Sequence, residues 1–298
     1  MKYTDDMGLR LINDFIFRYV FGREESKNLL LDLVNAVLVD AGAMAVRSLE
    51  LKNPVNLRDA TWAKETVVDI LATGEDGRQF DIEMQVHPHL GFINRSLYYW
   101  AQLYSGQLEK GEAYGILRPV VCINFVDFML FPDADENHHR FMISDVKNPE
   151  LVLTEDMQIH YVELNKKPPR ESALMRWAEF LENAGLEGKD MKVLFESNQL
   201  MKEAYKDFER CTQNEQLRAL ALSRERFQRD VVSRLYSAEQ EGLEKGMQQG
   251  MQQGMQQGMQ QGMEAAKLED ARRFKSLGVA MEIIVNATGL ASEIVEKL

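Results

Sequence analysis

Two predicted strands joined by a tight turn constrain the fold of this chain more than any other feature. Residues 65–73 are rich in β-branched side chains, and residues 79–86 alternate between polar and apolar side chains. Between them, Gly74-Glu75-Asp76-Gly77 is typical of a hairpin turn. The sequence therefore predicts an antiparallel pair of strands over residues 65–86.

This hairpin predicts two carboxylates on neighbouring strands. Asp69 is expected roughly opposite residues 82–84, and so close to Glu83, whereas Gln85 shares the face of Glu83 because strand side chains alternate. Converging carboxylates form a hard-oxygen site suited to Mg²⁺, with Mn²⁺ or Ca²⁺ as alternatives. A divalent ion there can activate a water molecule beside a phosphodiester and stabilise the departing oxygen. Spacing alone leaves a second interpretation open, because Asp81 also shares this face, as in an ordinary strand with one side in solvent.

The patterns that flank the hairpin predict an α/β domain with the order α-α-β-β-β-α-β. Lys166-Lys167-Pro168-Pro169 is typical of a domain boundary. Helices are expected at 9–22, 26–40 and 92–109, and strands at 45–51, 65–73, 79–86, 118–126, 139–144 and 159–164.

The rest of the chain predicts helices. Charges at i,i+4 spacing over residues 201–240 favour a long solvated helix or a coiled-coil arm. A Gly-Met-Gln-Gln repeat then occupies residues 246–261, and a fifth copy begins at Gly262. In a helix each copy advances its residues by only about 40°, so methionines and glycines form two slowly winding stripes. These stripes favour a closely paired helix, and a flexible linker is the alternative.

Residues 264–298 predict three short helical segments with the outline of a helix-turn-helix, for docking to protein or for contact with DNA. We therefore predict four regions: an α/β domain, a helical region with a long charged helix, a repeat arm and a small helical module. Their bounds are 1–167, 168–245, 246–263 and 264–298.

Asp69 followed by Glu83-x-Gln85 on the next strand resembles the PD-(D/E)XK nuclease superfamily, in which an Asp precedes a Glu-x-Lys. Further motifs lie along the chain: Asn13-Asp14-x-x-Phe17-x-x-x-Phe21-Gly22, Ile82-Glu83-Met84-Gln85-Val86, Arg95-x-x-x-Tyr99, Gly111-x-x-Tyr114 before Pro119-Val120, and Thr288-Gly289-Leu290. Together they resemble one branch of this superfamily, the Rpn family of recombination-promoting nucleases, which are often described as transposase-like.

The resemblance implies a restriction-endonuclease-like core of α-β-β-β-α-β order, followed by an all-α C-terminal region. It implies a Mg²⁺-dependent DNA endonuclease that cuts double-stranded DNA, with a role in DNA recombination or phage defence. It places the metal on Asp69 and Glu83. Gln85 stands where the superfamily usually has lysine, so that ammonium group is missing here.

Other residues are candidates for supporting roles. Lys64 is a candidate for the missing positive charge, although strand alternation points it to the opposite face from Asp69. Arg95 and Tyr99, one helical turn apart, support the site or contact DNA, and Asp14 or Glu24 can supply a carboxylate from a helix. As ordinary helix residues, Arg95 and Tyr99 would simply pack and pair with acids.

The net charge of −12 argues, taken over the whole chain, against a nucleic-acid binder, although arginines near the hairpin and in the long helix offer local contacts for phosphate. We also expect a homodimer or higher oligomer through the C-terminal arm, a cytoplasmic location and no membrane span. His138 and His139 are expected at the surface. The alternative function is a catalytically degenerate nuclease fold that serves as an oligomeric interaction or regulatory scaffold.

Overall fold

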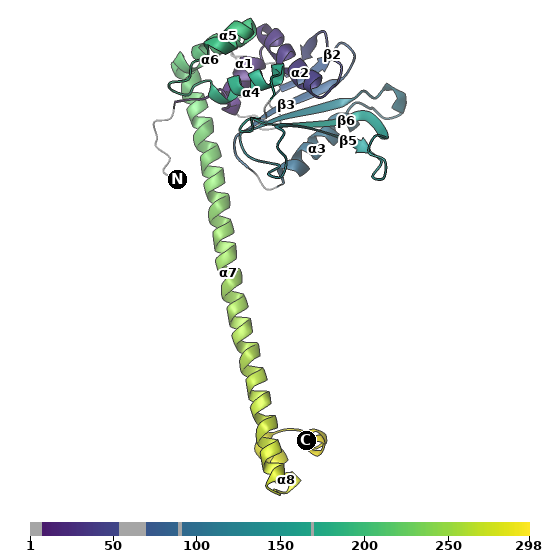
Figure 1. The fold of residues 1–298 in the computed structure, drawn as a ribbon, viewed down its shortest axis with the longest axis vertical. Coiled ribbons are helices and arrows are strands. Elements are labelled where there is room, and N and C mark those ends of the chain that lie inside the picture. The colour runs from purple at the N-terminus through teal and green to yellow at the C-terminus, as the bar shows by residue number, and fades with distance from the viewer. Residues whose placement is uncertain (1–7, 54–69, 89–90, 168–169) are drawn as a thin grey trace. The chain divides into compact units, whose positions relative to one another are not determined.

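The computed structural model describes residues 8–53, 70–88, 91–167 and 170–298. The chain forms two compact units, residues 1–229 and residues 230–298. The first unit contains a mixed β-sheet with helices on both faces (Figure 1). The predicted α/β class is therefore confirmed.

Within the described residues of the first unit, six strands form this sheet, in the order β1-β2-β3-β4-β6-β5. The strands β3, β4 and β6 run parallel to one another, whereas β1, β2 and β5 pair antiparallel with their neighbours. Their bounds are β1 Leu49–Leu51, β2 Ile70–Gly74, β3 Gln79–Gln85, β4 Val120–Val126, β5 His138–Ser144 and β6 Val152–Glu163.

The predicted hairpin is present as β2 and β3. Its turn contains Gly77 at a φ of +87°, a conformation that side chains with a Cβ rarely adopt. Ile70 pairs with Ile82 at the far end of the described ladder. The part of the predicted strand that contains Asp69 lies outside the described residues.

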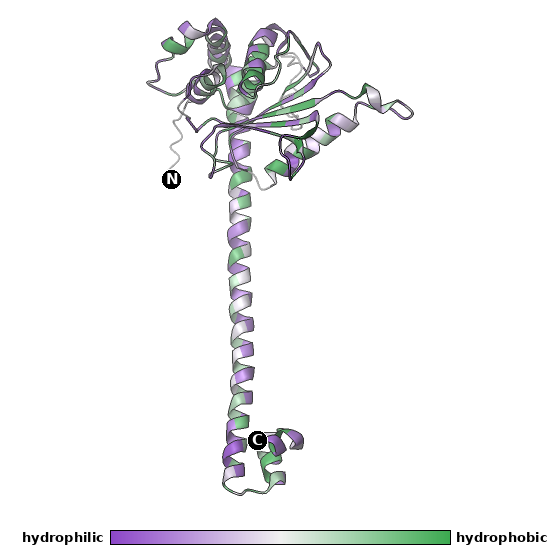
Figure 2. Ribbon diagram, turned by 45° about the vertical axis from the view of Figure 1, so that its right-hand side comes forward, coloured by the Kyte–Doolittle hydropathy of each residue, from purple (hydrophilic) through white to green (hydrophobic). Residues whose placement is uncertain are grey.

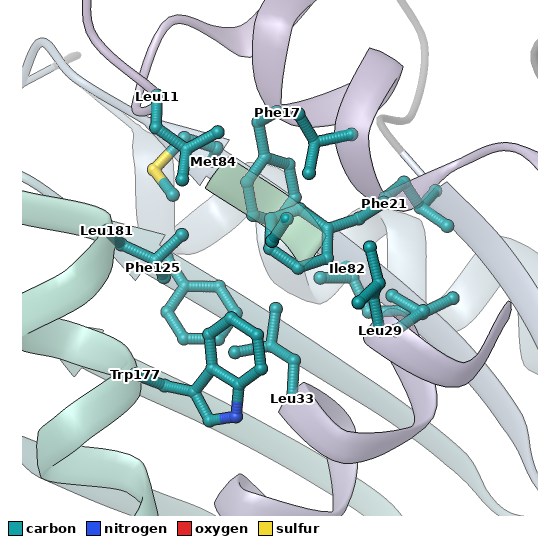
Figure 3. Packing of buried hydrophobic residues seen from close by; sticks show 14 of the residues in the cluster. Leu11, Phe17, Phe21, Leu29, Leu33, Ile82, Met84, Phe125, Trp177 and Leu181 are labelled. Atoms are coloured by element: carbon teal, nitrogen blue, oxygen red, sulfur yellow. The ribbon is translucent and has the colours of Figure 1, made fainter. Parts of the chain in front are cut away.

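Helices on one face of the sheet enclose the larger core. Phe17 and Phe21 from α1 (Asp14–Phe21) contact Phe125 of β4 and Trp177 of α4 (Ala173–Asn183), as Figure 3 shows. Ile82 and Met84 of β3 point into the same cluster. This unit also contains η1 Glu24–Ser26, α2 Lys27–Asp40, η3 Tyr114–Ile116, α5 Lys192–Ser197 and α6 Gln199–Gln213.

The first helix is shorter than predicted because Asn13 caps it. The Asn13 Oδ1 accepts hydrogen bonds from the backbone N–H groups of Phe15 (3.1 Å) and Ile16 (3.3 Å), so α1 begins at Asp14 rather than near residue 9. At the other end, Gly22 ends the helix as expected.

The opposite face of the sheet is covered by α3 (Phe92–Ser105), which packs on β4 and β6. Phe92 lies in a smaller buried cluster with Cys122 and Tyr161. Gly106 follows the last helical residue, so α3 ends four residues before the predicted end at 109.

His138 corrects the expectation that this histidine lies at the surface. It belongs to β5, and its side chain is only 3% exposed. Its Nδ1 lies 2.7 Å from Asp40 Oδ2 and its Nε2 lies 2.9 Å from His160 Nδ1. The pairing of β5 with β6 places His138 beside His160 and so buries it.

The long helix α7 (Glu215–Ser276) includes the entire Gly-Met-Gln-Gln repeat. The repeat is therefore helical and not a flexible linker. Its methionines are 56–74% exposed, and polar and apolar segments alternate along the helix (Figure 2).

Two short helices, α8 (Met281–Thr288) and α9 (Ser292–Lys297), complete the second unit. Ile284, Leu290 and Val295 pack with Ala271 of α7. The first of the three short helices predicted over residues 264–298 is instead the last part of α7, which continues to Ser276. Among the described residues, no helix has the length and apolar character needed to cross a membrane.

Candidate functional site

The polar face of β3 is buried under α3. Asp81 and Glu83 are 3% and 7% exposed, whereas Gln85 is partly exposed. The interpretation of this face as the solvent side of an ordinary strand is therefore wrong. A buried carboxylate is costly unless a partner compensates its charge, so each of these groups needs a chemical reason for its position.

Arg95 supplies a positive charge to this face from α3. A single guanidinium nitrogen, Nη2, lies 3.3 Å from Glu83 Oε2 and donates a 2.9 Å hydrogen bond to Gln85 Oε1. Its Nε is buried and has no hydrogen-bond partner among the described residues. An unsatisfied buried donor of this kind costs roughly 1–3 kcal/mol.

Two further hydrogen bonds hold Gln85, one through its side-chain nitrogen and one through its backbone. Its Nε2 donates to the backbone carbonyl of His87 (2.9 Å), and its backbone carbonyl accepts from the N–H of Asp127 (3.0 Å). This anchoring turns the amide oxygen toward the position that Arg95 Nη2 occupies. Glu83 Oε2 and Gln85 Oε1 thus converge on one cationic atom.

Burial raises the pKa of Glu83 to about 7, from an ordinary value of 4.5. Desolvation is the largest cause, and the nearby Asp81 carboxylate adds to it, whereas Arg95 acts in the opposite direction. Burial also raises the pKa of the Cys122 thiol, which lies opposite Asp81 in the ladder and forms a hydrogen bond with it. A cation near Glu83 would stabilise its charged form.

A row of polar groups continues from Glu83 across the next two strands. Asn124 pairs with Glu83 in the β3–β4 ladder, and Tyr161 pairs with Asn124 in the β4–β6 ladder. The Ser96 hydroxyl lies 3.3 Å from Asn124 Oδ1, and burial raises the pKa of the Tyr161 hydroxyl. Sequence reasoning missed this row, although an asparagine inside the apolar run 120–126 was a signal for it.

Two predicted site residues, Asp69 and Lys64, lie outside the described residues. The described ladder ends at the Ile70–Ile82 pair, next in sequence to Asp69 and Glu83. The convergence of Asp69 with Glu83 therefore stays a prediction.

The candidate helical carboxylates bind elsewhere. Asp14 Oδ2 accepts hydrogen bonds from Arg224 Nε and Gln228 Nε2 of α7, both at 2.7 Å. Glu24 forms an ion pair with Lys27 at the surface. Among the described residues, the hydrogen bonds and ion pairs of Asp14 lead to α7 and to its own helix rather than to Glu83.

Tyr99 lies one turn after Arg95 on α3 and is half-buried, with its ring 6.1 Å from that of Tyr98. Arg95 of this predicted pair contacts both Glu83 and Gln85.

The described oxygens fit a divalent cation. A carboxylate and an amide oxygen, the ligand types that Mg²⁺, Mn²⁺ and Ca²⁺ prefer, already converge on one positive nitrogen. Within the described residues, no group of three or more carboxylate, histidine or cysteine side chains is placed to hold a metal ion. Asp69 is the predicted further ligand.

A comparison with protein families decides the identity of this fold. Residues 11–238 match the PD-(D/E)XK nuclease family transposase. The chain belongs to this family. Comparisons with curated proteins and with solved structures returned no match.

Membership of the PD-(D/E)XK family confirms the resemblance drawn from the motifs and supports a nuclease-type function, with phosphodiester bonds as the chemical target. The matched residues include β3 and α3, and hence Glu83, Gln85 and Arg95. In this PD-(D/E)XK chain the cation beside position 85 comes from α3 and not from β3 itself.

Proposed function

We propose that this protein is a Mg²⁺-dependent endonuclease that cuts double-stranded DNA, with Asp69 and Glu83 as metal ligands. The observation that carries the proposal is the convergence of Glu83 Oε2 and Gln85 Oε1 on one cationic atom, on a buried face of β3. A divalent ion held there would supply the Lewis acid that activates water and stabilises the departing oxygen of the phosphodiester.

The chain's own residues prepare this site in three ways. The hydrogen bond from Gln85 Nε2 to the His87 carbonyl fixes the amide, so that its oxygen faces the position that Arg95 Nη2 occupies beside Glu83. The contact between Ser96 and Asn124 joins α3 to β4 beside Glu83. Burial withdraws Glu83 from water, which strengthens its interaction with any cation that enters.

Nicking of supercoiled plasmid DNA in the presence of Mg²⁺ tests this proposal. Because a metal ligand contributes several kcal/mol to such chemistry, Glu83→Gln and Asp69→Asn should each lower the nicking rate at least about 100-fold. Glu50→Gln is a matched control, because Glu50 is an exposed carboxylate of β1, and it should nick at the wild-type rate. Undiminished nicking by Glu83→Gln would exclude the mechanism.

The scaffold alternative makes a different prediction for metal binding. A catalytically degenerate protein would bind no divalent ion in a way that depends on Glu83. If plasmid DNA is not nicked, calorimetric titration of wild type and Glu83→Gln with Mn²⁺ distinguishes two explanations. Mn²⁺ binding that depends on Glu83 indicates an enzyme with a different substrate, whereas its absence indicates a scaffold.

We further propose that the repeat of α7 pairs with a second copy of the chain and makes the enzyme a homodimer. Support comes from the exposed methionines and from glycines at which an added Cβ meets no described atom within 4 Å. In a single helix, replacing Gly250 and Gly254 by alanine should stabilise α7 by about 1 kcal/mol per site. In a closely paired dimer the same change should raise the dissociation constant, which sedimentation velocity would measure.

A role in DNA recombination or phage defence in the cytoplasm completes the proposal and rests on the family alone. Expression of wild type in bacterial cells should raise the frequency of recombination between plasmid markers or reduce phage plaques. Glu83→Gln should do neither, and equal effects of both proteins would contradict a catalytic role.

A further inference from the structure

One nitrogen atom of Arg95 serves both oxygens that face the proposed metal. Nη2 lies 3.3 Å from Glu83 Oε2 and 2.9 Å from Gln85 Oε1. A guanidinium that formed a dedicated structural pair would use two nitrogens against the two carboxylate oxygens, as bidentate pairs do. Here a single nitrogen of the positively charged guanidinium lies between the Glu83 and Gln85 side chains of β3.

The remaining contacts of Arg95 hold it loosely. The ion pair with Glu83 is longer than the 2.7–2.9 Å that is typical of charge-assisted hydrogen bonds. The Arg95 side chain is 32% exposed, against 9% for Glu83, and its Nε is buried without a hydrogen-bond partner among the described residues. The guanidinium carbon lies 5.2 Å from the centre of the Phe92 ring, a weak cation–π contact at a partly exposed site.

These contacts show what Arg95 contributes. It compensates the charge of a buried carboxylate and meets an amide oxygen, but the geometry satisfies only part of its own donors. Partial exposure also gives the side chain a route to solvent that Glu83 lacks. A divalent cation is attracted to the same two oxygens as the Arg95 guanidinium, and it carries twice the charge.

We propose that Arg95 is a resident cation, which occupies the cation position between Glu83 and Gln85 in the metal-free protein and is displaced when a divalent ion binds. This inference rests on the proposed function, because it requires a metal at Glu83. Metal binding is then a competition between the ion and the guanidinium. The displaced guanidinium is chemically suited to a DNA phosphate, since arginine binds phosphate through a planar fork of donors.

The competing interpretation is an arginine that stays in place and orients Glu83 for the metal. The two roles give opposite signs for one measurement. Removing a competitor strengthens metal binding, whereas removing an orienting residue weakens it.

Calorimetric titration of the full-length protein with Mn²⁺ measures that sign. Arg95→Gln should bind Mn²⁺ about tenfold more tightly than wild type, which corresponds to the loss of one charge-assisted competitor. Arg95→Lys keeps a positive nitrogen and should stay close to wild type. Arg47→Gln removes the same charge from an exposed position before β1 and should also stay close to wild type.

A measurement on the wild-type protein covers the case in which Arg95→Gln does not fold. The Nε–H resonance of Arg95, assigned by its absence in Arg95→Lys, should shift on addition of Mg²⁺ with the midpoint that calorimetry gives for Mg²⁺ binding. An unchanged resonance at saturating Mg²⁺ would overturn the proposal.

The outcomes separate this inference from the proposed function. Absence of Glu83-dependent Mn²⁺ binding in wild type and in Arg95→Gln would refute the metal site itself. Glu83-dependent binding that is equal or weaker in Arg95→Gln would refute the displacement of Arg95 and leave the metal site standing.

Discussion

The side chains of β3 alternate between two faces of the sheet, and these faces are both buried but differ in chemistry. Phe80, Ile82 and Met84 lie on the face toward α1 and Trp177, within the larger core. Asp81 and Glu83 lie on the face toward α3, almost equally buried but ionisable. The first face gains free energy from every buried methylene group. The second loses free energy by desolvating charge, so burial of these carboxylates does not stabilise the fold.

The largest expected effect belongs to the apolar face. Phe80 is fully buried, so Phe80→Ala leaves a cavity and should lower the free energy of unfolding by about 3–5 kcal/mol. Urea denaturation followed by circular dichroism would measure this loss. Glu50→Ala, an exposed change in the same sheet, should stay within about 0.5 kcal/mol. A small loss for Phe80→Ala would mean that this face does not carry the stability of the sheet.

The polar face should respond in the opposite direction. Folding raises the pKa of Glu83 from 4.5 to about 7, so the folded state binds this proton more tightly than the unfolded state does. The contribution of Glu83 to stability is therefore fully present below pH 4.5 and is lost as the pH rises through 7.

Glu83→Gln removes this pH dependence. At pH 8 and without metal, the variant should be more stable than wild type by roughly 3 kcal/mol, and the difference should vanish toward pH 4. Urea denaturation of both proteins at a series of pH values measures it. If wild type were the more stable protein at pH 8, Glu83 would be a structural ion-pair partner like any other.

The smallest expected effect concerns the hydrogen bond that joins α3 to the sheet. Ser96→Ala removes the contact to Asn124 and should lower the free energy of unfolding by about 1 kcal/mol. It should also weaken metal binding, because Asn124 lies beside Glu83 in the ladder. Ser105→Ala is the control, an exposed hydroxyl near the end of the same helix. Equal losses of unfolding free energy in the two variants would mean that the Ser96–Asn124 hydrogen bond adds no more stability than an exposed serine does.

Alternation within strands was sufficient to predict the hairpin and to place Glu83 with Gln85, because both follow from local geometry. Burial of this face could not be predicted, since it depends on α3 packing against β4 and β6 from a distance in sequence. The pattern of β3 is the same whether a helix or water covers its polar side.

The contact between Arg95 and Glu83 also could not be predicted from the sequence. The spacing of Arg95 and Tyr99 on α3 marked both as candidates, but only tertiary structure brings Arg95 onto the strand. His138 was wrongly expected at the surface for the related reason that its burial arises from the β5–β6 pairing. The cap at Asn13, in contrast, depends only on contacts with the next three residues. The sequence predicted this helix but placed its start too early.

The helical repeat within α7 has a consequence for how this protein can vary between lineages. A gain or loss of four codons adds or removes one whole Gly-Met-Gln-Gln unit and leaves the reading frame intact. Each added unit lengthens the helix by about 6 Å and rotates the residues that follow by about 40° around its axis. Replication slippage would therefore change the length of the arm in discrete steps, without altering a single residue of Glu83's surroundings.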